Sequence, residues 1–130
     1  MADQVIQMKN GSDNAFPEIK AKTATAASTI TDSQTPVTLI KIGRLATALI
    51  PAIASQNIGA WATINIAQLP DEYKPAAAVR YPIIRQSQTT TNAVFYVIGI
   101  GGDLGLNNQG AAVSGTGAIM QTCISWITAS

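Results

Sequence analysis

Residues 61–75, WATINIAQLPDEYKP, decide the fold of this 130-residue chain. The first half of this stretch alternates, with Ile64 and Ile66 on one side and Trp61 on the other, which is the period of a β-strand. Pro70 then opens a turn and Pro75 fixes its exit. We therefore expect a strand that buries its isoleucines, leaves the tryptophan on the opposite face and ends in a rigid corner.

Two apolar residues of this corner, Leu69 and Tyr73, are expected to pin it to the core, with the tyrosine hydroxyl bonded to the main chain or to water. Beyond the corner, apolar runs are separated by Gly, Pro and Asn, and no window has the i, i+3, i+4 spacing of a long amphipathic helix. Strands are predicted at residues 37–42, 44–50, 60–67, 77–84, 93–99 and 117–128. This pattern predicts an all-β, antiparallel β-sandwich or jelly-roll-like domain.

The composition limits the partners. Lys and Arg number 8 against 7 Asp and Glu, so no field of one sign exists to attract nucleic acid. Charged residues make up 12% of the chain, about half the usual share. A surface so poor in charge is typical of one buried against identical copies. No run reaches the roughly 20 apolar residues of a membrane helix, and the N-terminus lacks a signal peptide, so neither insertion nor secretion is expected.

Domain organisation changes near Pro36. Residues 1–35 are predicted to be an N-terminal arm and linker. A short apolar run followed by turn formers indicates a hairpin or docking arm, and the Ala/Thr/Ser stretch at residues 20–35 indicates a slender neck. Residues 36–130 are predicted to form the β-sandwich head. The single cysteine, Cys123, fits a reducing cytosol and is expected to pack as a small apolar residue of the last strand.

The residue types of this chain give little support to a catalytic function. The chain has no histidine, so Ser-His and Cys-His nucleophile pairs are excluded, and a zinc site would have only carboxylates and one thiol. No metal and no cofactor is expected. A glycan hydrolase would have to pair Asp71 or Glu72 with Asp103. We expect the first two to be solvated turn residues, so the sequence indicates no enzyme.

The glycine-rich run at residues 99–105 follows a strand, but turn formers come after it where a phosphate site needs a helix. We expect a long, flexible connection whose polar side chains bind saccharide hydroxyls. The predicted saccharide-binding residues are Asp103, Asn107 and Asn108 in this connection, Arg80, Tyr81 and Arg85 as neighbours, and Trp126 as a stacking platform. Each has an alternative reading as a solvated, interface or core residue.

The corner resembles a pattern in the head domains of bacteriophage tail-fibre and baseplate receptor-binding proteins. The matching residues are Trp61, Leu69, Pro70, Tyr73, Lys74 and Pro75, and all of them except Lys74 are also taken as the scaffold of the corner. Lys74 stands where arginine is frequent in that family. The paired strands at residues 37–48, the glycine-rich run and the opening at residues 8–17 are similar too, so the resemblance covers most of the chain.

This resemblance implies a homotrimer on the virion, at the tail tip or baseplate, of a phage that infects Gram-positive bacteria such as lactic acid bacteria. The N-terminal arm would attach to other tail or baseplate proteins, and the head would bind host cell-wall polysaccharide without cleaving it. A departure is the short neck, which lacks the heptads of a coiled-coil stalk. A structural spacer without a sugar site and a carboxylate hydrolase are the alternatives.

Overall fold

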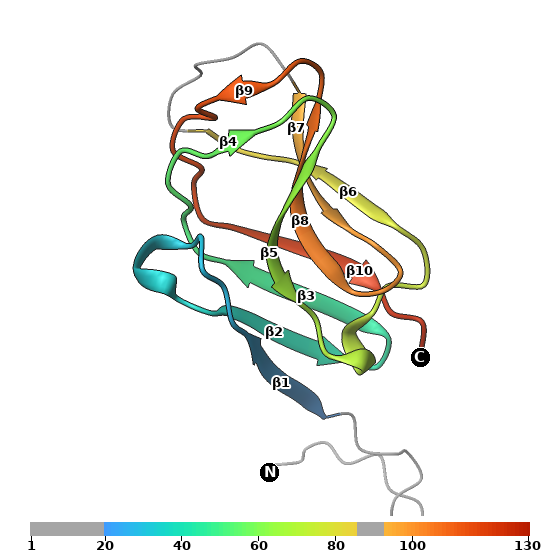
Figure 1. Ribbon diagram of the computed structural model, residues 1–130. Helices are drawn as coiled ribbons and strands as arrows, with labels where there is room; N and C mark the ends of the chain where they lie inside the picture. The colour runs from blue at the N-terminus through green and yellow to red at the C-terminus, as the bar shows by residue number, and fades with distance from the viewer. Residues whose placement is uncertain (1–19, 86–92) are drawn as a thin grey trace, which may run out of the picture.

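The computed structural model describes residues 20–85 and 93–130. The predicted docking arm, residues 1–19, lies outside this range. Two four-stranded antiparallel sheets form the body of the described chain (Figure 1). Sheet I has the order β1 (Ala21–Ala26), β2 (Val37–Ile42), β3 (Leu45–Ile50), β10 (Thr122–Ile127). Sheet II has the order β5 (Thr63–Gln68), β8 (Asp103–Gln109), β7 (Ala93–Ile98), β6 (Val79–Pro82).

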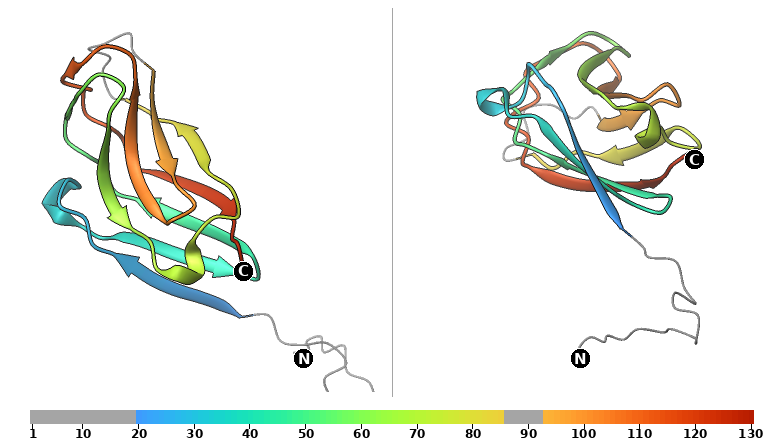
Figure 2. Two further views of the ribbon diagram at one scale, coloured as in Figure 1. Left: turned by 45° about the vertical axis from the view of Figure 1, so that its right-hand side comes forward. Right: turned by 90° about the horizontal axis from the view of Figure 1, so that it is seen from below.

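The two sheets form two layers, as the view from below shows (Figure 2). A two-stranded ladder of β4 (Asn57–Ile58) and β9 (Val113–Ser114) closes the upper end. The helical content described is two 3-10 turns, η1 (Asp32–Gln34) and η2 (Asp71–Tyr73). The prediction of an all-β, sandwich-like fold is confirmed.

The core lies between the sheets because every second residue of each strand points inward. Sheet I contributes Leu39 and Ile50, and sheet II contributes Tyr96, Leu104 and Leu106, all buried. Burying each large apolar side chain stabilises the fold by about 1.5–3 kcal/mol. In the described part of the chain, no helix has the length and apolar character that would carry it across a bilayer.

The Ala/Thr stretch is an edge strand, and the prediction of a neck for residues 20–35 is wrong. β1 pairs antiparallel with β2 over its whole length, and Ala26 is buried in the core. An edge strand needs hydrogen bonds to one neighbour only, so small side chains suffice there. Thr31 then donates a hydrogen bond to the Thr35 carbonyl (2.6 Å) across η1. The attachment role of residues 1–35 stays a prediction.

The glycine-rich run is a tight turn and a central strand, so the prediction of a flexible connection is wrong. The turn closes with a 2.8 Å hydrogen bond from the Gly102 amide to the Gly99 carbonyl. β8 then lies between β5 and β7. A Cβ at Gly105 would stand 2.6 Å from the Ile64 carbonyl oxygen. Glycine is therefore there to let β5 approach β8 closely, not to make the chain flexible.

The last strand begins later than predicted, at Thr122. Ile119 instead makes isolated bridges to Ile53 and Arg85, so the alternation predicted through residues 117–128 breaks before β10. Within β10, Ile124 and Trp126 point inward. Cys123 is exposed, contrary to the expectation that it packs inside.

The corner at residues 61–75 is fastened to sheet I. Leu69 and Tyr73 are buried, as predicted. The Trp126 indole donates a hydrogen bond to the Tyr73 carbonyl (2.8 Å), and the Lys41 ammonium donates one to the Glu72 carbonyl (2.8 Å). The Tyr73 hydroxyl is buried and makes no hydrogen bond to another atom of the described chain.

A second core hydroxyl, that of Tyr96, is also buried without a hydrogen-bond partner among residues 20–85 and 93–130. Tyr96→Phe is expected to raise the free energy of unfolding by about 1 kcal/mol at neutral pH, because an unpaired buried hydroxyl costs more than it contributes.

Burial raises the pKa of Tyr96 from its ordinary value of 10.0 to about 12. The unfolded chain therefore ionises first, and the wild-type protein loses stability as the pH rises from 10 towards 12. The advantage of Tyr96→Phe should grow over this range. Urea unfolding at neutral and alkaline pH measures it, and a variant less stable than wild type at neutral pH would contradict the argument.

Candidate functional site

The outer face of sheet II gathers aromatic, amide and hydroxyl side chains. The strand register places Thr63 beside Asn107 and Asn107 beside Phe95. One row further along, Asn65 lies beside Gly105, Gly105 beside Val97 and Val97 beside Arg80. These residues point outward because their neighbours Ile66, Leu106 and Tyr96 fill the core.

Trp61 stands at the upper end of this face and is 68% exposed. Its φ of 55° lies in the left-handed region, which bulky residues rarely adopt. Two main-chain hydrogen bonds hold this conformation. The Ala62 amide donates to the Gly59 carbonyl (3.1 Å) and closes a turn, and the Trp61 amide donates to the Gly110 carbonyl (2.9 Å). Backbone strain that the surroundings enforce on an exposed aromatic residue is typical of functional sites.

The amides next to Trp61 are held in place by one another. The Asn107 side chain donates a hydrogen bond to the Thr63 hydroxyl (2.8 Å), and the Gln109 side chain donates one to the Asn107 carbonyl oxygen. Fixed amides of this kind can both donate to and accept from ligand hydroxyls. An exposed indole beside them offers a flat apolar surface.

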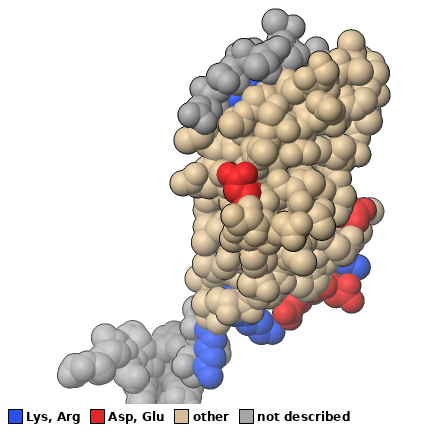
Figure 3. All heavy atoms as spheres, turned by 60° about the vertical axis from the view of Figure 1, so that its left-hand side comes forward, with Lys and Arg blue, Asp and Glu red and all other residues tan. Residues whose placement is uncertain are grey.

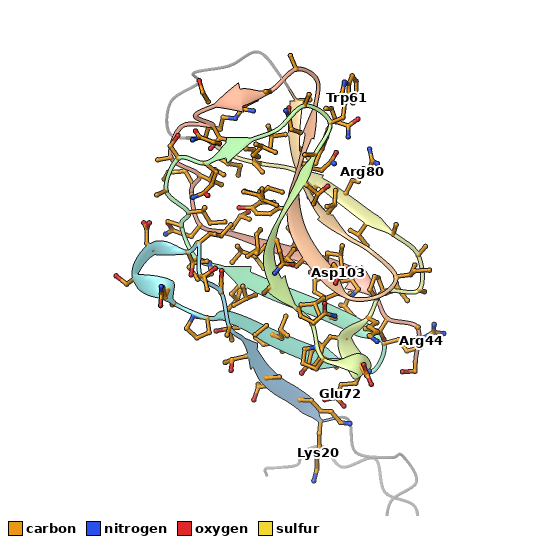
Figure 4. The ribbon with its side chains drawn as sticks, viewed as in Figure 1. Lys20, Arg44, Trp61, Glu72, Arg80 and Asp103 are labelled. Carbon is orange, nitrogen blue, oxygen red and sulfur yellow. The ribbon has the colours of Figure 1, made fainter. Side chains whose placement is uncertain are left out.

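Three of the predicted site residues reach this face: Arg80, Asp103 and Asn107. Arg80 and Asp103 are exposed on β6 and β8. Figure 4 shows Trp61 and Arg80 projecting from the same side of the molecule at its upper end, with Asp103 lower down. The face therefore carries one cation and one carboxylate among neutral polar groups.

The structure places Asn108, Trp126 and Tyr81 elsewhere. Asn108 is fully buried and its amide bonds to main-chain carbonyls, among them those of Gly59 (3.0 Å) and Ala111 (2.8 Å). Trp126 belongs to the core, so it presents no stacking platform. Tyr81 points inward and its hydroxyl donates to the Ser125 carbonyl (2.6 Å), which joins the two sheets.

Arg85, the last of the predicted residues, is half-buried and forms a bridge with Ile119, away from this face. Sequence reasoning missed the role of Trp61, which it assigned to the scaffold, and the outward residues Thr63, Asn65, Phe95 and Gln109. Alternation of β5 and β7 was the signal for Thr63, Asn65 and Phe95, since it places these side chains opposite the buried ones. Gln109 lies on β8 and Trp61 in the turn before β5, so alternation of those two strands does not find them.

Acidic groups do not combine into a catalytic or metal site in the described residues. Asp71 forms an ion pair with Lys74 (2.9 Å), and the Lys74 hydrogen bond and charge lower the pKa of Asp71. A general acid needs the opposite shift. No group of three or more His, Cys, Asp or Glu side chains within residues 20–85 and 93–130 is placed to hold a metal ion.

Charged side chains gather at the lower end of the molecule. Figure 3 shows a broad face with little charge and most of its blue and red atoms near the bottom. Lys20, Arg44 and Glu72 mark this end in Figure 4. At the upper end, Trp61 and Arg80 project from the same side (Figure 4). The neutral side chains of Thr63, Asn107 and Gln109 are hydrogen-bonded to one another beside Trp61, which suits a ligand recognised through stacking and hydrogen bonds.

Models of known protein families give no match to this chain, and a search of curated proteins finds no relative.

Proposed function

We propose that this chain is a non-enzymatic receptor-binding protein of a phage tail or baseplate, and that it binds cell-wall saccharide of a Gram-positive host. The observation that supports this most is the exposed, conformationally strained Trp61 beside the amides of Asn107 and Gln109. The apolar face of a sugar ring stacks on an indole, while its hydroxyls exchange hydrogen bonds with amides. Arg80 and Asp103 flank the same surface.

The proposal includes a homotrimer with a jelly-roll-like head at the tip of the virion tail and attachment through residues 1–35. An open sheet face binds one saccharide weakly because it buries only one side of the ligand. Three heads in each trimer raise the effective affinity by orders of magnitude through multivalency. The lowered pKa of Asp71 keeps this carboxyl ionised at neutral pH, so Asp71 is not suited to be the general acid of a carboxylate hydrolase.

Trp61→Ala is expected to weaken binding by about tenfold or more, which corresponds to a loss of about 1.4 kcal/mol per site. Its stability should change by no more than about 0.5 kcal/mol, because the side chain is exposed. Ile100→Ala is the matched control, since Ile100 is 69% exposed in the turn between β7 and β8.

The measurement is the binding of purified protein to a panel of immobilised Gram-positive cell-wall polysaccharides. Saturable binding that Trp61→Ala weakens and Ile100→Ala preserves is the expected result. Absence of binding across the panel would favour the spacer function, and release of new reducing ends would favour the hydrolase.

A further inference from the structure

The outer face of sheet I carries no charged side chain. The register aligns three rows across its four strands, and these rows are Ala21–Ile42–Leu45–Ile127, Thr23–Ile40–Thr47–Ser125 and Thr25–Thr38–Leu49–Cys123. Ile42, Leu45, Leu49 and Ile127 are each 42–54% exposed on it. A face turned to water would be expected to alternate polar and charged residues with the buried ones.

The charges of this sheet lie on its other side. The lysines of its strands, Lys22 and Lys41, alternate with the outward residues. Lys41 is buried, and its ammonium donates to the main-chain oxygens of Glu72 (2.8 Å) and Ser130 (2.9 Å). Lys22 lies 3.6 Å from the Glu72 carboxylate. Lysine is rarely buried, and several isoleucine and leucine side chains are rarely exposed together on one surface. Sheet I therefore has the residue pattern of a sheet that is covered on both faces.

An apolar groove extends this face at one end. Its volume is about 400 Å³, and it is lined by Pro36, Thr38, Leu49, Pro51 and Cys123 among others. The face and the groove therefore form one continuous uncharged surface that runs from the turn after β3 to the end of β10.

The geometry points to a second copy of this chain as the occupant of the outer face of sheet I. Its partner must also be uncharged, because a charge buried there would lose its hydration without compensation. The outer face of sheet II carries Arg80 and Asp103, and the lower end carries the ion pairs of Lys22 and Lys74. Among the described surfaces, the same face of the other copies is the complement that fits. In a trimer the three faces would turn towards the threefold axis, so that the two edges of each face meet different neighbours.

The size of the face determines how strongly a single substitution should weaken the contact between copies. Four strands of six residues cover roughly 400 Å², taking spacings of about 4.8 Å and 3.3 Å. A specific interface buries about 800 Å² per partner, so the groove and neighbouring loops must contribute the rest. One charge within the face should then be enough to dissociate the assembly. This inference names the surface of the proposed trimer and rests on that proposal for the number of copies.

Ile42→Glu tests the assignment, with Ile100→Glu as a control that makes the same change outside the face. Light scattering should give wild type and Ile100→Glu three times the chain mass of 13.5 kDa, and Ile42→Glu the mass of one chain with an unchanged circular dichroism spectrum. An assembly that survives Ile42→Glu overturns the inference and leaves the trimer standing. A dimeric wild type that Ile42→Glu dissociates supports the face and overturns the trimer.

Cys123 provides a test on the wild-type protein itself, because it is the only cysteine and stands on this face beside Leu49. Its reaction with a thiol reagent should slow at least tenfold as protein concentration rises through assembly. An equal rate in both states overturns the inference. If the Cys123 thiol is protected although the protein is a monomer, residues 1–19 of the same chain cover the face, and both the inference and the trimer are overturned. Saccharide binding through Trp61 is tested separately.

Discussion

Asn108→Ala is expected to lower the free energy of unfolding by about 3 kcal/mol. The Asn108 amide is buried and donates to the main-chain carbonyls of Gly59 (3.0 Å) and Ala111 (2.8 Å). Asn108 is fully buried, so truncation to alanine removes these hydrogen bonds, at about 0.5–1.5 kcal/mol each, and leaves a cavity in place of the amide group, which adds to the loss. Urea unfolding measures the change.

The same variant should also weaken saccharide binding, although Asn108 does not touch the outer face of sheet II. Asn108 fastens the turn at Gly59 and the segment after Gly110, which together hold Trp61 in its strained conformation. Asn107→Ala is the neighbouring control. We expect it to weaken binding and to change stability by no more than about 0.5–1 kcal/mol, because Asn107 lies outward. Equal stability of the two variants would contradict the assignment of Asn108 to the scaffold.

Gly105→Ala is expected to destabilise the protein by about 2–4 kcal/mol, because overpacking against main-chain atoms forces the backbone to shift. The new methyl group would stand 2.6 Å from the Ile64 carbonyl oxygen and 2.9 Å from the Thr63 methyl group. Relief requires β5 to move away from β8, which would also disturb Thr63 and its bond to Asn107.

Gly101→Ala is the matched control, since a methyl group there meets no atom within 4 Å. Thermal unfolding of both variants beside wild type tests the pair. A Gly105→Ala protein as stable as Gly101→Ala would show that β5 and β8 are not constrained at this crossing.

Strands rich in branched and aromatic residues could be predicted from the sequence, and the limits of β2 were predicted without error. Their own side chains supply the burial that stabilises them, so the pattern is local. β1 and β8 could not be predicted in this way. The Ala/Thr strand β1 is stabilised by pairing with β2, and β8 owes its glycine to the approach of β5. Both causes lie in distant parts of the chain.

Part of the candidate site could also be predicted, because it depends on local alternation within strands. Alternation correctly placed Thr63 and Asn65 on the outer face of β5, but Trp61 lies in the turn before this strand, so the prediction of Trp61 as a strand residue is wrong. Alternation also separates Asn107 from Asn108 once β8 is known to be a strand. In a loop at residues 103–109, nothing in the sequence would distinguish these two asparagines. The burial of Trp126 depends on the corner carbonyl of Tyr73, which is far away in sequence.

Acrylamide quenching of tryptophan fluorescence tests the central claim most directly, which is that saccharide binds on the outer face of sheet II over Trp61. The chain has 2 tryptophans. Trp126 is 5% exposed, so a collisional quencher reaches Trp61, which is 68% exposed. We predict that a saturating polysaccharide from the binding panel removes most of the quenchable fluorescence. Saturable binding that leaves the quenching of Trp61 unchanged would contradict the account.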